Sequence, residues 1–163
     1  MKTLKLIITM GILSGILSLF GCGNKANKAG NIIPQAEQIE IAQLIDELKL
    51  LEQNKTEYNF IGITSNGIDC IYFVKENGKF QIEFEAMTET QIPYIDKLKS
   101  FASQNGYEIQ MTSYGNKPNY NASEAPVLVI VTNSNLEKTA EIGQKIQKEI
   151  FKNYADTKYD VVP

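Results

Sequence analysis

The chain has 163 residues and a net charge of −3, from 16 basic and 19 acidic side chains, and every basic residue is a lysine. The sequence contains no histidine, which excludes Ser-His-Asp and Cys-His nucleophiles, histidine-ligated zinc and an imidazole proton switch. It contains no arginine either, so no bidentate fork for phosphate is available, and any chemistry must depend on carboxylates, lysine, tyrosine or Cys70.

The first segment has the three parts of an export signal. Lys2 and Lys5 give a positive start, Leu6 to Phe20 form a largely apolar stretch, and small Gly21 precedes Cys22. A helix needs about 20 apolar residues to cross the hydrocarbon of a bilayer, so this stretch is short for a permanent anchor. An ordinary secretory signal, or an uncleaved anchor, is the alternative interpretation.

The residues Leu19-Phe20-Gly21-Cys22 resemble the lipobox of bacterial lipoproteins. The resemblance implies cleavage between Gly21 and Cys22 and lipid, such as palmitate, on Cys22; Phe20 is bulkier than the residue usual there. The implied location is the cell envelope. In a Gram-negative cell, Gly23 is consistent with the outer membrane, on its periplasmic or surface side, because Asp at this place is the family's common inner-membrane retention signal.

Residues 22–32 are predicted to be the lipidated cysteine and a flexible linker, and residues 33–163 a single domain. Loss of residues 1–21 leaves 14 lysines against 19 acids, a net charge of −5. Nucleic acid is therefore not expected as a partner. Acylation of Cys22 leaves Cys70 as the only thiol, and its apolar neighbours predict an inert, packed side chain.

The first half of the domain is predicted to contain one helix and three strands. Apolar residues at helical spacing predict a helix over 35–53, and strands follow over 58–63, 69–74 and 79–86. Asn77-Gly78 joins the last two strands, and this dipeptide suits a type I′ turn because both central residues need positive φ. The turn pairs Phe73 with Ile82 and Ile71 with Phe84, on a side that should meet the helices. The other side carries Gln81, Glu83 and Glu85 opposite Val74, Tyr72 and Cys70, and we expect it to be partly solvated.

The second half is predicted to be helix 89–104, strand 107–113, an exposed polar loop 114–126, strand 127–131 and helix 136–151. A tail over 158–163 is predicted as an added edge strand. The fold class is therefore α+β, an antiparallel-rich sheet packed with helices in the order α-β-β-β-α-β-β-α.

That order of elements resembles the type III secretion chaperone-like fold, including Tir-chaperone-like domains. The likeness covers the whole domain and rests on element order alone, so no functional residue is carried over. It implies a binding module that often dimerises and holds another polypeptide without chemistry of its own. The lipobox departs from the cytosolic family, and a tethered immunity protein against a toxin would be one use outside the cytoplasm.

Two groups of side chains are candidates for a site. Glu83 and Glu85 share one strand face at roughly 7 Å, within range of a paired-carboxylate hydrolase, and Glu89 could join them; a solvated strand face is the plainer interpretation. Tyr72, Tyr114 and Tyr120 join the pair as candidate partner-binding residues, with Tyr114 and Tyr120 as exposed aromatic anchors. No cofactor and no metal site is expected, since the sequence has no calcium-loop motif.

Three hypotheses follow. The first is a membrane-tethered lipoprotein with a non-enzymatic, protein-binding domain, resembling an immunity protein. The second is a carboxylate-dependent envelope hydrolase or small-ligand binder using Glu83 and Glu85. The third is a structural envelope protein.

Overall fold

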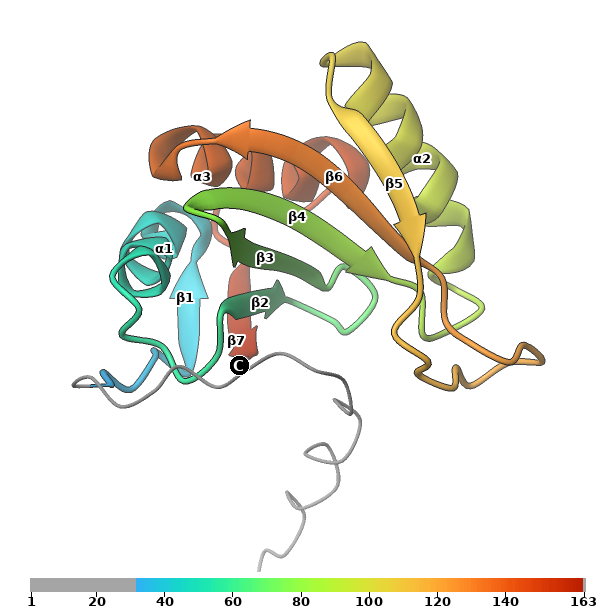
Figure 1. Cartoon of the computed structure of the whole chain (residues 1–163), viewed down its shortest axis with the longest axis horizontal. Helices are drawn as coiled ribbons and strands as arrows, with labels where there is room; N and C mark the ends of the chain where they lie inside the picture. The colour runs from blue at the N-terminus through green and yellow to red at the C-terminus, as the bar shows by residue number, and fades with distance from the viewer. Residues whose placement is uncertain (1–31, 163) are drawn as a thin grey trace, which may run out of the picture.

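The computed structural model describes residues 32–162, so the predictions for Gly21, Cys22 and most of the linker lie outside the described residues. Within this range the protein is an α+β domain built on one antiparallel sheet, as predicted, with strand order β1-β7-β2-β3-β4-β6-β5 (Figure 1). The strands are β1 (Gln38–Glu40), β2 (Phe60–Thr64), β3 (Ile71–Glu76), β4 (Lys79–Glu85), β5 (Glu108–Thr112), β6 (Val127–Ser134) and β7 (Lys158–Val162). The helical elements are the 3₁₀ turn η1 (Ile41–Gln43), α1 (Leu44–Glu52), α2 (Ile92–Gln104), α3 (Leu136–Lys145) and the π-helical turn η2 (Ile146–Ile150).

The prediction of one helix over 35–53 was wrong at its N-terminal end. Strand β1 and turn η1 precede α1, and Ile39 is buried in β1 opposite Tyr159 of β7. Glu40 and Gln43 form a capping box that starts the helical region, with the Glu40 amide donating to Gln43 Oε1 over 2.8 Å. Pairing with a strand distant in sequence thus outweighs the helical periodicity of this segment.

The C-terminal tail does form a strand, but its predicted position at the sheet edge was wrong. Strand β7 lies between β1 and β2, pairing antiparallel with both, and Tyr159 is buried. The tail therefore completes the interior of the sheet. A partner strand as short as β1 leaves almost no periodic signal in the sequence, which is why the edge was misplaced.

The hairpin between β3 and β4 is confirmed. Asn77 and Gly78 have φ values of 50° and 76°, as a type I′ turn requires, and Phe73 pairs with Ile82. Tyr72 consequently lies opposite Glu83. The turn therefore fixes which side chains share each face of the sheet.

The helices cover one face of the sheet (Figure 1), and the core lies between them and the strands. Phe73, Ile82 and Phe84 supply much of the strand side of this core. Helix α3 approaches closely at Gly143, where an added Cβ would lie 2.6 Å from Cζ of Phe73. The opposite face of the sheet is left for other contacts.

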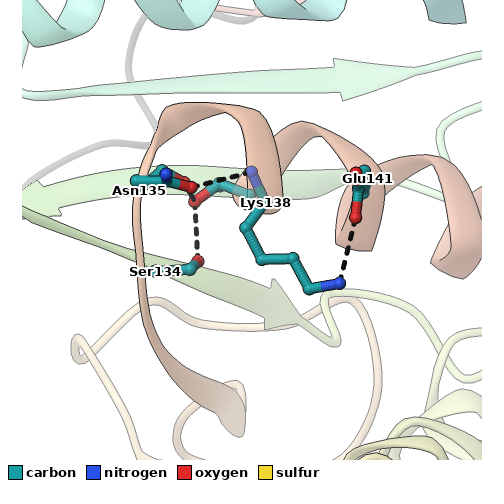
Figure 2. Close-up of polar contacts among 5 residues, drawn as sticks. Ser134, Asn135, Lys138 and Glu141 are labelled. Carbon is teal, nitrogen blue, oxygen red and sulfur yellow. Dashed lines mark hydrogen bonds and ion pairs between the residues drawn. The ribbon is translucent and has the colours of Figure 1, made fainter.

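The helix predicted over 136–151 is present as α3 followed directly by η2, and its first turn is capped. Asn135 accepts a 3.0 Å hydrogen bond from the Lys138 amide, and Lys138 pairs with Glu141 one turn later (Figure 2). The helix changes from α to π hydrogen bonding at Ile146. Gln147 lies in this turn and is buried.

Candidate functional site

The predicted site residues gather on the sheet face opposite the helices, which we call the loop-covered face and define by Tyr72, Glu83 and Glu85. Tyr72 lies opposite Glu83, and Glu83 lies opposite Val129 of β6. The segment between β5 and β6, residues 113–126, folds over this face, and its side chains bond to both carboxylates. Side chains from three separate parts of the sequence thus meet here.

Tyr72 is positioned by two neighbours on β2. Its ring lies over Gly62, where an added Cβ would stand 2.8 Å from the ring, so β2 needs glycine at this point. The ring of Phe60 meets Tyr72 edge-on, with centroids 6.0 Å apart. Burial is the main cause of the raised pKa of the Tyr72 hydroxyl, and the nearby Cys70 adds to it. This hydroxyl therefore stays protonated.

This face was predicted to be partly solvated, and Cys70, Tyr72, Val74 and Gln81 are indeed partly exposed, but Glu83 and Glu85 themselves are buried. Only 9% of Glu83 and 8% of Glu85 is exposed. The Tyr114 hydroxyl donates to Glu83 Oε2 over 2.7 Å, and the Asn116 amide donates to Glu85 Oε1 over 2.8 Å. The loop thus replaces the water that both carboxyl groups would otherwise have.

Burial raises the pKa of both glutamates. For Glu83 the hydrogen bond from Tyr114 opposes the rise, while the charges of Glu76 and Glu85 add to it. For Glu85 only the hydrogen bond from Asn116 opposes burial. The two groups are therefore easier to protonate than ordinary glutamates.

The 113–126 loop is irregular, as predicted, but it is less exposed than expected. Tyr114 and Tyr120 are half-buried, and the Tyr120 hydroxyl donates to the backbone carbonyl of Ala86 over 2.8 Å. Pro118 and Ala125 are buried. The two tyrosines anchor the loop to the end of β4, so their hydroxyls are engaged inside the domain.

A paired-carboxylate hydrolase needs one protonated acid and one ionised nucleophile or base, which different environments usually provide. Here the environments of Glu83 and Glu85 shift both pKa values upward. Glu89, the third predicted member, is exposed in the turn before α2. The arrangement can hold a proton between the sheet and the loop, but it does not separate two catalytic roles.

Cys70 lies beside this cluster and has the environment expected of a packed thiol. It is half-buried next to Tyr72. Burial raises its pKa from the usual 9.0 to about 12, and the charges of Asp69 and Glu85 add to the shift. The thiolate, which is the nucleophilic form, is correspondingly scarce.

A second polar cluster, around Asp69, was not predicted. Asp69 is 1% exposed, and its carboxylate accepts hydrogen bonds from Thr64, Ser65, Asn66 and Asn153. Burial alone would raise its pKa, but these hydrogen bonds outweigh burial and hold the pKa below the usual value. The turn formers Ser65-Asn66-Gly67 were the only local signal of this site.

One residue in the π-helical turn and one just after it bond to Asp69. Gln147 is 1% exposed and donates to the Asp69 carbonyl over 3.0 Å, while Asn153 donates both to the Asp69 carboxylate and to Gln147 Oε1. Gln91, before α2, holds the same β2–β3 turn through the carbonyls of Gly67 and Ile68. The β2–β3 turn is therefore held by two other segments, one before α2 and one from η2 to Asn153.

A groove of about 460 Å³ lies elsewhere, between α2 and η2. Tyr94, Lys97, Glu149 and Lys152 are among its lining residues, and the Lys97 ammonium stands 4.3 Å from the Tyr94 ring centroid. None of the predicted site residues lines it. The groove and the loop-covered face are thus separate features.

Comparisons with known proteins add no assignment: no family model, curated protein or solved structure matches this chain. Among residues 32–162, no three histidine, cysteine, aspartate or glutamate side chains are grouped as a metal site would require. None of the helices in that range is long and apolar enough to cross a bilayer.

Proposed function

We propose that this chain is a lipid-anchored protein of the bacterial cell envelope whose domain binds another protein and carries out no reaction. The anchor is inferred from the Leu19-Phe20-Gly21-Cys22 sequence and the charged, apolar and small segments around it. The use we favour is that of an immunity protein, which neutralises a toxin by binding it.

The observation that carries the binding proposal is the arrangement of Glu83 and Glu85 beneath the loop. Both carboxyl groups are hydrogen-bonded to loop side chains and both have raised pKa values. An arrangement of this kind fixes the shape of a loop. Conformationally defined loops on a rigid sheet are a common means of protein recognition.

The charge of the domain indicates what kind of partner it would accept. After removal of residues 1–21 the net charge is −5, and Glu76 adds to the acidic potential felt by Glu83. A partner with a basic surface would be attracted at long range and would associate faster at low salt.

Site-specific cross-linking in cells tests the proposal. A photoreactive lysine analogue replaces Lys117, which is exposed on the loop, and in a matched control it replaces Lys145, which is exposed on α3. We expect a discrete protein adduct from position 117 that position 145 does not give. Identical adduct patterns from both positions, or adducts with lipid alone, would contradict binding through this face.

Labelling with a fatty-acid probe tests the anchor separately. We expect label on the native chain and none on the Cys22→Ser variant, which should also leave the membrane fraction. Label that persists in the variant would refute the lipobox assignment without bearing on the loop.

The second candidate function is a carboxylate-dependent hydrolase, which the raised pKa of Glu83 favours because a general acid needs such a shift. Turnover of an envelope polymer that Glu83→Gln abolishes, while the exposed-site variant Glu89→Gln leaves it unchanged, would support this alternative over binding.

A further inference from the structure

Strand β5 forms one edge of the sheet, with only β6 beside it in the strand order. All of its residues, Glu108 to Thr112, are exposed. The opposite edge is β1, which has three residues. Among residues 32–162, β5 is thus the longer edge that another strand could extend.

Natural edge strands are usually protected by lysine, proline or a bulge. Strand β5 reads Glu-Ile-Gln-Met-Thr and contains neither lysine nor proline, and its pairs with β6 run without a break from Glu108–Val131 to Thr112–Val127. The only charged side chain in the strand is Glu108. The edge therefore has the composition of a strand that pairs with another chain.

An apolar strip accompanies the edge. Ile109 and Met111 are 37% and 48% exposed, and they lie on the helix side of the sheet because they pair with the core residues Ile130 and Leu128. Helix α2 lies beside β5 (Figure 1), and its first residue, Ile92, is 38% exposed. These are three of the six large apolar side chains exposed within residues 32–162.

We propose that the β5 edge is a dimer interface, in which β5 pairs antiparallel with β5 of a second copy around Gln110. In this register Gln110 faces Gln110 of the other copy, Ile109 faces Met111, and Glu108 faces Thr112. Each apolar side chain thereby meets the other on the same face, so the strip covers itself.

The self-matching apolar strip favours a second copy as the occupant, and the charge on the strand does not oppose it. Pairing around Gln110 places the two Glu108 side chains about 14 Å apart, from the rise of about 3.4 Å per residue. That separation exceeds the Debye length of about 8 Å at physiological salt, so the repulsion between them is largely screened. The strand can therefore pair with its own copy without placing like charges opposite each other, and the two sheets would continue into one.

Disulfide trapping tests the register with the full-length chain purified in detergent. In Gln110→Cys the two new thiols face each other within the Cα distance of about 4.4–6.8 Å that a disulfide requires, so oxidation should give a covalent dimer. Glu108→Cys and Thr112→Cys are matched controls on the same strand. Each alone should give about tenfold less dimer, because each faces the other position and not itself.

A mixture of the Glu108→Cys and Thr112→Cys chains should cross-link between variants and complete the test. Equal cross-linking of all three single variants would overturn the register, and a monomeric mass for the native chain would overturn the dimer. Cross-linking of Gln110→Cys to a different protein in cells would assign the edge to a heterologous strand. Ile109→Lys, at an exposed position, should abolish the dimer while leaving the circular dichroism spectrum unchanged.

Discussion

The Tyr114 hydroxyl donates a 2.7 Å hydrogen bond to a carboxylate oxygen of Glu83, 31 residues earlier in the chain. This contact joins the 113–126 loop to the middle of the sheet, and the bond from Asn116 to Glu85 repeats it at the next position on the same face. The loop is thus held by side chains, and its conformation depends on a few polar contacts.

Removal of one hydroxyl should therefore loosen the loop. Tyr114→Phe keeps the ring but leaves Glu83 without its donor, and we expect a loss of about 1–2 kcal/mol in the free energy of unfolding. Urea denaturation measures the loss. Tyr154→Phe is the control, because Tyr154 is 80% exposed and its change should lie within about 0.5 kcal/mol of zero. Equal effects of the two substitutions would show that the Tyr114 contact is not formed.

The pH dependence of stability follows from the raised pKa of Glu83, whose main cause is burial. Because its pKa is higher in the folded state than in the unfolded chain, its contribution is complete below pH 4.5 and is lost as pH rises through the folded value. The glutamine of Glu83→Gln does not titrate, so the variant does not lose this stability as pH rises. Its amide oxygen can still accept the hydrogen bond from Tyr114. Relative to the native chain, the variant should therefore become more stable on going from pH 4 to pH 7.

Burial raises the pKa of Glu85 too, so Glu85 also lowers the stability of the native chain as pH rises. The double variant Glu83→Gln with Glu85→Gln should therefore show a still flatter dependence of stability on pH. Glu89→Gln is the matched control at an exposed site and should follow the native curve. Denaturation midpoints at several pH values measure the profiles. A native profile that rises between pH 4 and 7 and is unchanged by Glu83→Gln would contradict the assignment.

The loop-covered face shows how far the sequence could predict this domain. Asn77-Gly78 fixed the β3–β4 register, and with it the shared face of Tyr72, Glu83 and Glu85, because a two-residue turn leaves one pairing. The burial of Glu83 and Glu85 on that face could not be predicted. It depends on where the loop comes to lie, and the glycine, asparagine and proline residues of a loop indicate a turn but not what it packs against.

The same limit accounts for the N-terminal error and for the missed Asp69 cluster. Ile39 fits a helical stripe and a short strand equally well, and only its pairing opposite Tyr159 decides between them. Asn153 reaches Asp69 across 84 positions of the chain, shortly after a π-helical turn that no local pattern predicts. Local patterns thus predicted the elements, while contacts between distant segments decided the edges and the polar clusters.

Cys70 should react slowly in the folded protein. With a pKa of about 12, against 9.0 for an ordinary thiol, its thiolate fraction near pH 8 falls by about a thousandfold. Alkylation by iodoacetamide, followed by mass spectrometry in the Cys22→Ser chain, measures the rate. Urea-unfolded protein is the control and should react at the rate of a free thiol. Equal rates for the folded and unfolded chains would show that the thiol is accessible and ionisable.

The Asp69 carboxylate should be the most sensitive single group among those described here. Asp69→Asn replaces a charged acceptor with an amide, one end of which is a donor facing the donors Thr64, Ser65 and Asn153. Hydrogen bonds to charged groups contribute about 1.5–3 kcal/mol each, so we expect the substitution to cost about 3 kcal/mol at pH 7. Asp156→Asn, on an exposed turn, is the matched control and should be close to neutral.

Acid titration distinguishes this role from simple loss of packing. Hydrogen bonds hold the folded pKa of Asp69 below 3.8 despite burial, so the carboxylate's contribution is complete above pH 3.8 and is lost as pH falls through the folded value. The native chain should therefore lose stability on acidification below pH 4, and Asp69→Asn should lose less, so that the two denaturation curves converge at low pH. A gap between the curves that stays constant down to pH 2 would mean that Asp69 acts through shape alone. Convergence would identify the carboxylate charge as what holds the β2–β3 turn to Asn153, and with it the π-helical turn to the sheet.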